Sequence, residues 1–479
     1  MAEVKTQDFV KASQAALENP KIQQALRAVG GFDQARREAI DELTPEVWEE
    51  LREKGRQIKS HAIENLDVYL DMLEGRVTQN GGHVHFARDA EEANAIVADI
   101  ARQHGVKLVV KSKSMVSEET RVNDALKEIG VEAIETDLGE YIVQLADETP
   151  FHIVAPAIHK TREDVAQLFA EKIDRPGLVE IEDMAAAARD TLRQKFLQAD
   201  MGITGANFLV AETGTLVIIS NEGNGRLCTS APRIHVALAG VEKVVPSLED
   251  LAVMLRLLPR AATGQRLTSY VSMVSGPKRD DDEDGPEEFH LILIDNGRLR
   301  LLADPDLREA LNCIRCGACL NVCPVYQKVG GHAYGWVYPG PIGAVITPTM
   351  VGMKQAKDLP FASTLCGACR DACPVKIDIP RMLLHQRRKL SEGTERGGPR
   401  PPVTEKLSAW SYQRIMSGRL TLALIRRLAL LFQRPFVREG RIRRLPFPPF
   451  SRWTRARDMP VMAPKTFRQL WDQKLSKER

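Results

Sequence analysis

The chain has 479 residues, of which 43% are hydrophobic and 27% are charged, and its formal net charge is +2. This length is more than one ordinary hydrophobic core supports, so two or three domains are expected. The nearly balanced charge excludes a general attraction to nucleic acid, and the composition is that of a soluble globular protein.

No targeting or membrane-spanning segment is expected. The first twenty residues are polar and lack the apolar stretch of a secretory signal. The most apolar stretch, residues 420–432, is shorter than the roughly 18 residues of a spanning helix. It is also interrupted by Arg426 and Arg427. We therefore expect a cytoplasmic protein.

The first half of the chain changes from a helical pattern to an alternating one. Residues 1–76 are expected to be helical, because apolar residues recur there at helical spacing among Glu, Leu and Arg. Strands are expected at 83–87, 106–111 and 131–137, separated by helices at 89–105 and 116–130. Such alternation predicts a parallel sheet covered by helices, and we assign an α/β domain to residues 77–300.

The later part of this domain is rich in strand-forming residues. Two strands are expected within residues 207–220, joined at Thr213 and Gly214, and another within residues 233–246. The acidic run at 278–288 separates two further strands and is predicted to be a solvated loop.

Three polar features of the α/β domain are weak candidates for a site. Lys111–Ser114 lies between a strand and a helix, where backbone amides can hold an anion and where open α/β sheets bind ligands. A structural role is the favoured alternative there. It is favoured also for Glu212 beside a hairpin turn, and for His83 and His85 on one strand face.

A different unit is expected at residues 301–390. Asp304 as N-cap and Pro305 as first helical residue predict a helix that runs toward Cys313. Further on, residues 332–348 are rich in Gly and Pro, which predicts an irregular, packed cover over the cysteines.

Residues 391–479 form a basic C-terminal extension, with 20 Lys and Arg against 7 Asp and Glu, a local excess of +13. We expect a partly extended appendage that contacts an acidic partner or the surface of a membrane. A solvated segment without such a role is the alternative.

The first cysteine run follows the spacing C-x2-C-x2-C-x3-C and ends in Pro324. Its members are Cys313, Cys316, Cys319 and Cys323. This is the spacing of bacterial ferredoxins, in which three cysteines bind one cubane cluster and the fourth binds a second cluster.

A second run supplies Cys366, Cys369 and Cys373 at C-x2-C-x3-C, followed by Pro374. Crossed ligation assigns Cys313, Cys316, Cys319 and Cys373 to cluster one, and Cys323, Cys366 and Cys369 to cluster two. Zinc is disfavoured because each structural zinc ion takes four ligands, whereas the seven cysteines of the two runs do not divide into two sets of four. In a reducing compartment, metal binding is also a better prediction than disulfides.

The second run lacks one cysteine, because Ser363 stands where a full run would begin. Four possibilities stay open at this point. Cluster two is a [3Fe-4S] cluster, or a [4Fe-4S] cluster with a non-cysteine ligand, or it is completed by Cys228 or by a partner protein. Cys228 is expected to be an ordinary buried thiol.

The sequence contains neither a G-x-G-x-x-G motif after a strand nor a Walker A motif. A built-in nicotinamide, FAD or ATP site is therefore not expected. An electron carrier without an organic cofactor must exchange electrons with other proteins.

Several long strings resemble the lactate utilization protein B family. They are VKSKSMVSEE, ETDLGEYIVQL, ITGANFLVAETGTLVIISNEGNGRLCT, CIRCGACLNVCPVY and YPGPIGAVITP. The resemblance covers about residues 60–390. The resemblance implies an α/β fold similar to the NagB/RpiA/CoA-transferase-like fold, followed by an α-helical ferredoxin-type domain with two [4Fe-4S] clusters. The seven cysteines match the family's cluster ligands, including the three-cysteine second run.

The resemblance also implies a role. Members of this family act with two partner proteins, one of which carries cysteine-rich CCG repeats, in the oxidation of L-lactate to pyruvate. We therefore expect an electron-transfer subunit. Two alternatives are an iron–sulfur subunit of another 2-hydroxy-acid dehydrogenase, such as one acting on glycolate, and an enzyme with its own substrate site in the α/β domain.

Overall fold

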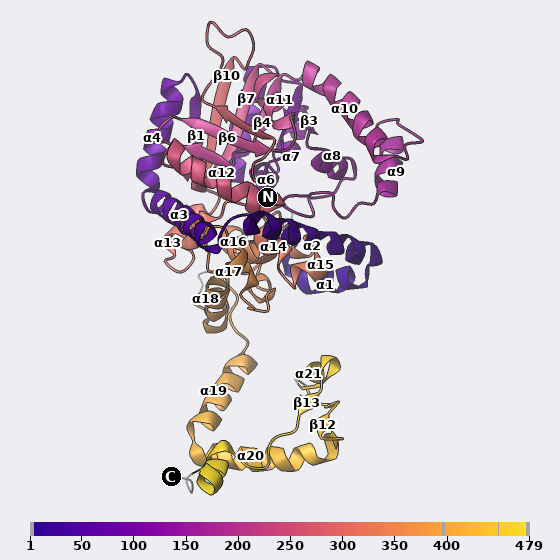
Figure 1. Cartoon of the computed structure of the whole chain (residues 1–479), viewed down its shortest axis with the longest axis vertical. Coiled ribbons are helices and arrows are strands. Elements are labelled where there is room, and N and C mark those ends of the chain that lie inside the picture. The colour runs from indigo at the N-terminus through magenta and orange to yellow at the C-terminus, as the bar shows by residue number, and fades with distance from the viewer. Residues whose placement is uncertain (1–3, 395–397, 449, 476–479) are drawn as a thin grey trace. The chain divides into compact units, whose positions relative to one another are not determined.

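The computed structural model describes residues 4–394, 398–448 and 450–475, which belong to two compact units divided after Pro399 (Figure 1). The first unit contains the α/β domain and all the cysteines, and the second contains the basic extension.

The first unit begins with four helices, as the apolar spacing predicts. They are α1 (Phe9–Glu18), α2 (Pro20–Asp41), α3 (Pro45–Glu64) and α4 (Leu66–Gln79). The starts of α2 and α3 combine two signals. Asn19 and Thr44 accept hydrogen bonds from backbone N–H groups of the first turn, and a proline follows each of them.

The α/β domain is built on a six-stranded sheet, and the predicted parallel arrangement is confirmed. The strand order is β1 (His83–Ala87), β10 (Glu288–Ile294), β7 (Ile234–Gly240), β4 (Met201–Thr204), β2 (Leu108–Lys111) and β3 (Glu132–Glu135). All five pairings are parallel. Both faces are buried, which explains why the central strands are almost wholly apolar.

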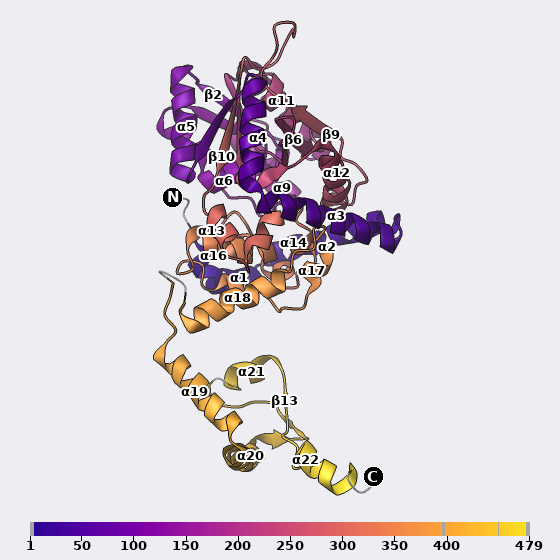
Figure 2. The ribbon, with the colours of Figure 1, turned by 90° about the vertical axis from the view of Figure 1, so that its left-hand side faces the viewer.

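Helices and a second sheet cover the two faces of this sheet. One face packs against α5 (Ala90–Gln103), α6 (Met115–Thr120) and α7 (Val122–Glu128). The other packs against α4 and the small sheet. Figure 2 shows α5 on one side, with β6, β9 and α12 on the other. The helix predicted over 116–130 is in fact two helices, because Arg121 has a positive φ of 57° and breaks the helical path.

The small sheet has the order β8 (Val244–Val245), β5 (Phe208–Val210), β6 (Thr215–Ser220) and β9 (Tyr270–Val274). The predicted hairpin at Thr213 and Gly214 is confirmed, and Gly214 adopts the left-handed φ of 68° that such a turn favours. The acidic run is a loop, and it connects strands of different sheets.

The remaining helices of the α/β domain lie in the connections between strands. They are α8 (Leu138–Leu145), α9 (Arg162–Lys172), α10 (Ile181–Gln198), α11 (Asn224–Ser230) and α12 (Leu248–Thr263).

The cysteine-rich region is a compact set of short helices. They are α13 (Arg298–Ala303), α14 (Ala318–Asn321), α15 (Tyr326–Val329), α16 (Gly340–Val351), α17 (Ala368–Ala372) and α18 (Ile379–Glu392). The predicted helix start at Asp304 is wrong. Asp304 ends α13, and its carbonyl and carboxylate instead accept hydrogen bonds in a turn that leads to a 3-10 helix at Arg308–Asn312.

The predicted irregular cover is also wrong in part. Residues 340–351 form α16, most of whose residues are buried in the core, including Ile342 and Val345. Pro341 is compatible with helix because it lies in the first turn, where its missing N–H has no intrahelical partner.

The second unit is mainly helical, and the expected extended character is confined mainly to short strands and irregular stretches between residues 437 and 466. Its main helices are α19 (Val403–Ser417) and α20 (Arg419–Gln433), followed by short elements: β11 (Val437–Arg438), β12 (Arg441–Ile442), α21 (Phe450–Ala456), β13 (Met459–Pro460) and α22 (Phe467–Leu470). Neither long helix has a buried residue. Within the described ranges, no helix is long and apolar enough to cross a membrane.

Candidate functional site

The two cysteine runs fold in the same way. In each run, the residue before a Cys-Gly-Ala-Cys sequence and the glycine inside it have positive φ, with values of 60° and 77° for Arg315 and Gly317 and of 56° and 89° for Leu365 and Gly367. A short helix follows each, α14 in the first run and α17 in the second. The repeated backbone shape curls each run around its cysteines, which is what cluster binding requires.

Four cysteines line one small apolar cavity between the two runs. They are Cys313, Cys316, Cys319 and Cys373, the set predicted for cluster one. Isoleucine and valine side chains, among them Ile342 and Ile377, line most of the rest of the cavity, together with Arg315. Burial and the charge of the nearby Cys313 raise the pKa of the Cys373 thiol to about 11. Metal binding must therefore displace protons from buried thiols here.

The remaining three cysteines influence one another as a second set. Burial raises the pKa of the Cys369 thiol to about 12, and the charges of Cys323 and Cys366 add to this rise. Burial also raises the pKa of Cys323. Cys366 is exposed, and a backbone N–H at Ala368 lowers its pKa. The second set thus reaches the surface, whereas three of the four cysteines of the first set are buried.

Backbone N–H groups point at three of the sulfur atoms. Arg315 N–H donates to Cys313 Sγ at 3.4 Å, Tyr326 N–H to Cys323 Sγ at 3.5 Å and Ile377 N–H to Cys373 Sγ at 3.4 Å. Such bonds stabilise negative charge on sulfur and tune the potential of a bound cluster. The residues present therefore fit iron–sulfur clusters.

Ser363 reproduces the local geometry of Cys313. The Oγ of Ser363 accepts a hydrogen bond from the N–H of Leu365, two residues later, at 3.1 Å. Cys313 Sγ accepts the equivalent bond from Arg315. Both side chains are half-buried. The serine thus occupies the position that a fourth cysteine would have.

Basic side chains surround the first set. Arg315 is buried, lies with its guanidinium carbon 4.6 Å from the ring centre of Tyr338, and contacts Glu242 at 3.4 Å. Lys59 is buried and donates to the carbonyl oxygens of Glu242 and Val244. Burial lowers the pKa of Lys59 to about 7. Helix α3 and the first cysteine run therefore place basic side chains next to the first cavity.

The weaker candidates prove to be structural. The Lys111 ammonium is buried and bound by carboxylates, so it is not available to an anion. Glu212 accepts a hydrogen bond from the N–H of Leu248 at the start of α12. His85 bonds to His290 at 3.1 Å within the sheet.

Cys228 is the ordinary buried thiol that was expected. It is fully buried in α11, and its sulfur lies 3.5 Å from the Oγ1 of Thr136. Burial raises the pKa of the thiol to about 12.

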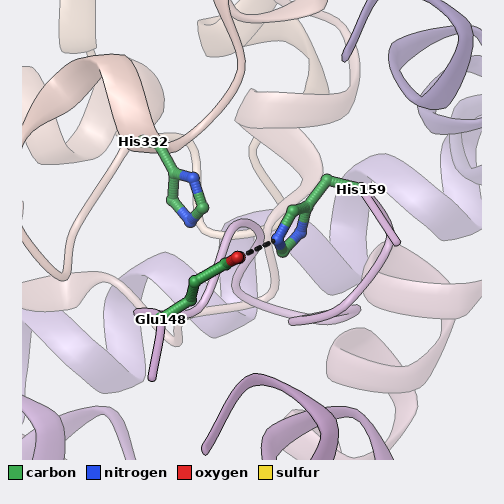
Figure 3. Close-up of side chains that lie close together, drawn as sticks. All are labelled: Glu148, His159 and His332. Atoms are coloured by element: carbon green, nitrogen blue, oxygen red, sulfur yellow. Dashed lines mark hydrogen bonds and ion pairs between the residues drawn. The ribbon is translucent and has the colours of Figure 1, made fainter. Parts of the chain in front are cut away.

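Two polar clusters that line one cavity were not predicted from the sequence, and neither was a third, formed by Asp304, Asp306 and His385 in the cysteine-rich region. Glu148, His159 and His332 meet where the α/β domain touches the cysteine-rich region (Figure 3), with Glu148 Oε2 2.7 Å from His159 Nε2. His332 Nε2 donates to the carbonyl of Thr149 at 2.8 Å. The second cluster joins Glu118, Glu135 and Glu140. The only signal for it in the sequence was that Lys111 and Glu135 end neighbouring strands.

Comparisons with known proteins agree with this architecture. The sequence profile of the LUD domain matches residues 70–294, and that of a 4Fe-4S dicluster domain matches residues 309–377. Relatives named lactate utilization protein B align over most of the chain. The one from Bacillus licheniformis is 43% identical, with 99% of this chain and 98% of the relative covered. That from Bacillus subtilis (strain 168) is 44% identical, with 93% and 91% covered. That from Bacillus cereus (strain B4264) is 46% identical, with 90% of each covered.

Proposed function

The chain belongs to the lactate utilization protein B family, and on that basis we propose that it is the iron–sulfur electron-transfer subunit of a system that oxidises L-lactate to pyruvate. The observation that carries the proposal is the placement of two adjacent cysteine sets, one lining a buried cavity and one reaching the surface. We place the protein in the cytoplasm, where a reducing environment keeps cysteine thiols available as metal ligands.

We assign two clusters to these sets. Cys313, Cys316, Cys319 and Cys373 would hold a [4Fe-4S] cluster in the buried cavity, and Cys323, Cys366 and Cys369 would hold the second. Ser363 would complete the second set through its hydroxyl oxygen, because it has the backbone position and the hydrogen bond of Cys313. Bound clusters would supply one-electron transfer.

The surroundings of the two sets favour different roles. Exposed Cys366 makes the second set the natural point of contact with a partner protein. The first set is enclosed, and the positive charges of Arg315, Lys59 and Arg52 lie close to it. Positive charge stabilises the more negative, reduced state of a cluster, so these basic side chains of α3 and of the first cysteine run, Arg52 and Arg315 above all, would raise the potential of cluster one.

The partners are proposed to be the other two proteins of the lactate utilization system, one of which carries CCG repeats. One partner would deliver electrons from its substrate site, and the other would accept them. An analogous role with glycolate is the alternative, and turnover of the assembled system with lactate or glycolate distinguishes the two.

The test of the central proposal replaces one ligand of cluster one. Cys316→Ser should remove the electron-paramagnetic-resonance signal of one reduced cluster, lower the iron count by up to roughly four per chain and abolish turnover of the assembled system. Cys228→Ser is the matched control, because it makes the same change at a buried cysteine outside both sets. Turnover retained by Cys316→Ser without cluster one would contradict the proposal.

The fourth ligand is tested by two variants of one residue. Ser363→Ala should convert the second cluster to a three-iron form, with its characteristic signal in the oxidised protein. Ser363→Cys should keep four irons and shift the reduction potential, since a thiolate replaces an oxygen ligand. Identical iron content and spectra for the wild type and Ser363→Ala would exclude Ser363 as a ligand.

We also propose that the second unit contacts anionic membrane surfaces. In α20, Leu420, Leu424, Leu428 and Phe432 are exposed, and Arg426 and Arg427 lie among them in a segment with a charge excess of +13. Exposed apolar side chains combined with basic ones are typical of helices that bind at membrane interfaces.

Sedimentation with phosphatidylglycerol vesicles tests this contact on the full-length protein. The wild type should sediment with these vesicles at low salt and not with vesicles of neutral phosphatidylcholine. Arg426→Glu combined with Arg427→Glu should abolish sedimentation. Arg102→Glu, which reverses the charge of an exposed arginine on α5, should leave sedimentation unchanged. Equal sedimentation of all three proteins would rule out the contact.

A further inference from the structure

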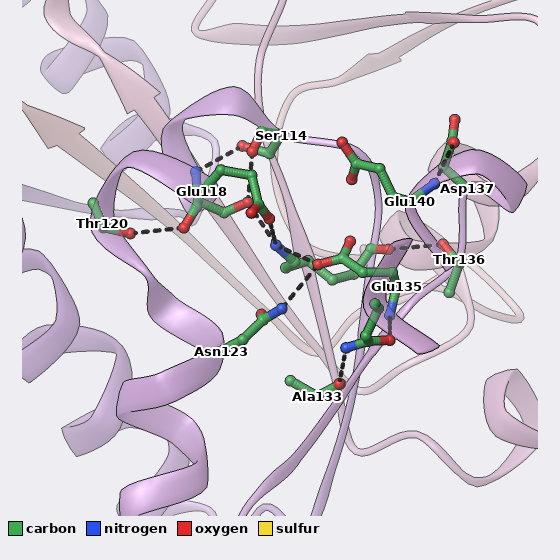
Figure 4. Close-up of polar contacts among 12 residues, drawn as sticks. Ser114, Glu118, Thr120, Asn123, Ala133, Glu135, Thr136, Asp137 and Glu140 are labelled. Carbon is green, nitrogen blue, oxygen red and sulfur yellow. Dashed lines mark hydrogen bonds and ion pairs between the residues drawn. The ribbon is translucent and has the colours of Figure 1, made fainter. Parts of the chain in front are cut away.

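Three glutamates meet at one end of the parallel sheet, and none of them belongs to either cysteine set. They are Glu118, Glu135 and Glu140, and one carboxylate oxygen of each lies within 4.8 Å of those of the others. Figure 4 shows the three carboxylates gathered around one place beside the sheet. Glu135 and Glu140 are almost fully buried, whereas the side chain of Glu118 is 21% exposed.

The topology of the sheet brings these residues together. Lys111 ends β2 and Glu135 ends β3, and the two strands are parallel neighbours in register at this pair. Glu118 lies in α6, which follows β2, and Glu140 lies in the first turn of α8, which follows β3. The carboxyl ends of adjacent strands and the helices after them are where open α/β sheets place ligands.

The buried ammonium of Lys111 does not satisfy all the carboxylate oxygens. Its Nζ donates to Ser117 Oγ at 2.8 Å and Glu118 Oε1 at 2.9 Å, and it lies 2.6 Å from Glu135 Oε1. Since an ammonium has three protons, these three contacts use all of them. No proton of Lys111 is left for another oxygen.

Three buried acceptor oxygens therefore lack a donor among the described residues. They are Glu135 Oε2 and both oxygens of Glu140. Glu140 is 1% exposed, so bulk water does not solvate its carboxylate. Buried carboxylate oxygens without partners are strongly unfavourable, which means that an electropositive group is missing from this place.

The charge of the cluster identifies the missing group. Three carboxylates and one ammonium sum to −2 when all are ionised, and a divalent cation would neutralise them. The three carboxylates lie close enough to repel one another when ionised, and an additional positive charge would remove this conflict.

The ligand atoms and the access route fit a hard cation. All three candidate ligands are carboxylate oxygens, which Ca²⁺, Mg²⁺ and Mn²⁺ prefer. Oxygen atoms up to 4.8 Å apart can contact one ion of this kind, because each bond is roughly 2.1–2.6 Å long. Glu118, Glu135 and Glu140 also line a cavity of about 1420 Å³, which provides the route of entry.

We propose that Glu118, Glu135 and Glu140 form a binding site for a divalent cation that prefers oxygen ligands. The site lies in the α/β domain, and neither cysteine set contributes to it. It would give the α/β domain a ligand-binding role that does not depend on electron transfer.

The experiment measures Mn²⁺ binding to the full-length protein by the loss of the free-ion resonance signal at room temperature, where iron–sulfur signals are not observed. The wild type should bind one Mn²⁺ per chain, in competition with Mg²⁺ or Ca²⁺. Glu140→Gln removes one ligand charge with little change of shape and should weaken binding roughly tenfold or more.

Glu148→Gln is the matched control, because Glu148 lines the same cavity and belongs to the other polar cluster. It should bind Mn²⁺ like the wild type. Mn²⁺ should also raise the melting temperature of the wild type and of Glu148→Gln but not that of Glu140→Gln. The melting transition of Glu140→Gln without Mn²⁺ checks that this variant is folded before its binding is compared.

Two results would overturn the proposal. One is the absence of stoichiometric Mn²⁺ binding by the wild type, which would mean that protons neutralise the buried carboxylates. The other is binding that Glu148→Gln abolishes and Glu140→Gln leaves intact, which would place the ion at the histidine-containing cluster. The Cys316→Ser variant should bind Mn²⁺ normally, so loss of a cluster and loss of this site are distinguishable.

Discussion

Replacing Arg298 with methionine should cost about 3–5 kcal/mol of folding stability. Arg298 is 1% exposed and joins the α/β domain to the cysteine-rich region. Its guanidinium holds Glu119 through two contacts of 2.8 and 2.9 Å and contacts Glu242 at 2.5 Å. The hydroxyl of Tyr338 donates to Glu119 at 2.6 Å, and Arg315 contacts Glu242. The Arg298→Met variant keeps most of the side-chain volume but leaves two buried carboxylates without their main partner.

Two independent estimates give the magnitude. Removing one member of a buried ion pair costs about 3–5 kcal/mol, because the other charge stays buried and unpaired. For Glu242, burial alone would raise the pKa, but the charges of Arg298 and Arg315 lower it from 4.5 to about 2. That shift corresponds to roughly 3 kcal/mol at neutral pH, of which Arg298 supplies the largest part and Arg315 and Lys243 supply further parts. Because the folded pKa is depressed, this stabilisation is complete above pH 4.5 and is lost as the pH falls toward 2.

Urea unfolding of the full-length protein, followed by circular dichroism, measures this loss through the transition midpoint and slope. Arg102→Met is the matched control, because Arg102 pairs with Asp99 at 2.8 Å on the surface, where both side chains are more than half exposed. Exposed pairs contribute about 1 kcal/mol or less. If Arg298→Met were no more destabilising than the control, the buried network would not contribute the expected free energy of about 3–5 kcal/mol to folding.

Three further outcomes are expected. Burial lowers the pKa of His152 from 6.5 to about 4, so between these pH values the unfolded chain binds a proton that the folded chain does not. The free energy of unfolding should therefore decrease by up to roughly 3 kcal/mol as the pH falls from 6.5 to 4, and His152→Gln should reduce this pH dependence of the urea midpoint. A methyl group on Gly331 would overlap the carbonyl oxygen of Phe151, so Gly331→Ala should destabilise by about 1–3 kcal/mol, whereas Gly30→Ala in open helix should stabilise by up to about 1 kcal/mol in the same assay. Arg315→Gln should make the midpoint potential of one cluster more negative in a redox titration, because a buried positive charge is removed.

The features that the sequence predicted are those encoded by neighbouring residues. Alternating apolar strands and amphipathic helices predicted the parallel sheet, since each element carries its own period. The hairpin at Thr213 and Gly214 needs only a turn signal between two apolar runs. The cysteine spacing predicted that Cys373 would lie with Cys313, Cys316 and Cys319, and these four side chains line one cavity; that they bind one cluster stays a prediction.

The features that it missed depend on burial. The run at 340–351 contains Gly and Pro, which locally favour irregular structure, yet it is a helix enclosed by the core. Asp304 has the side chain of an N-cap, but the helix on its N-terminal side ends there, and its carboxylate also bonds Lys389 and His385. In both places tertiary packing outweighs local preference.

The polar clusters show most clearly why the cysteine set could be predicted and the cation site could not. Most cysteines of an iron–sulfur site stand at fixed short spacings in recognisable runs, and the crossed contribution of each run follows the same rule. Glu118, Glu135 and Glu140 follow two different strands, and no spacing rule connects them. Glu119 and Arg298 are separated by 179 residues and meet only because α6 and α13 are brought together in the folded unit. Buried carboxylate clusters are recognised in the folded structure by counting the hydrogen-bond partners of each buried oxygen, because an unpaired buried carboxylate requires a physical explanation.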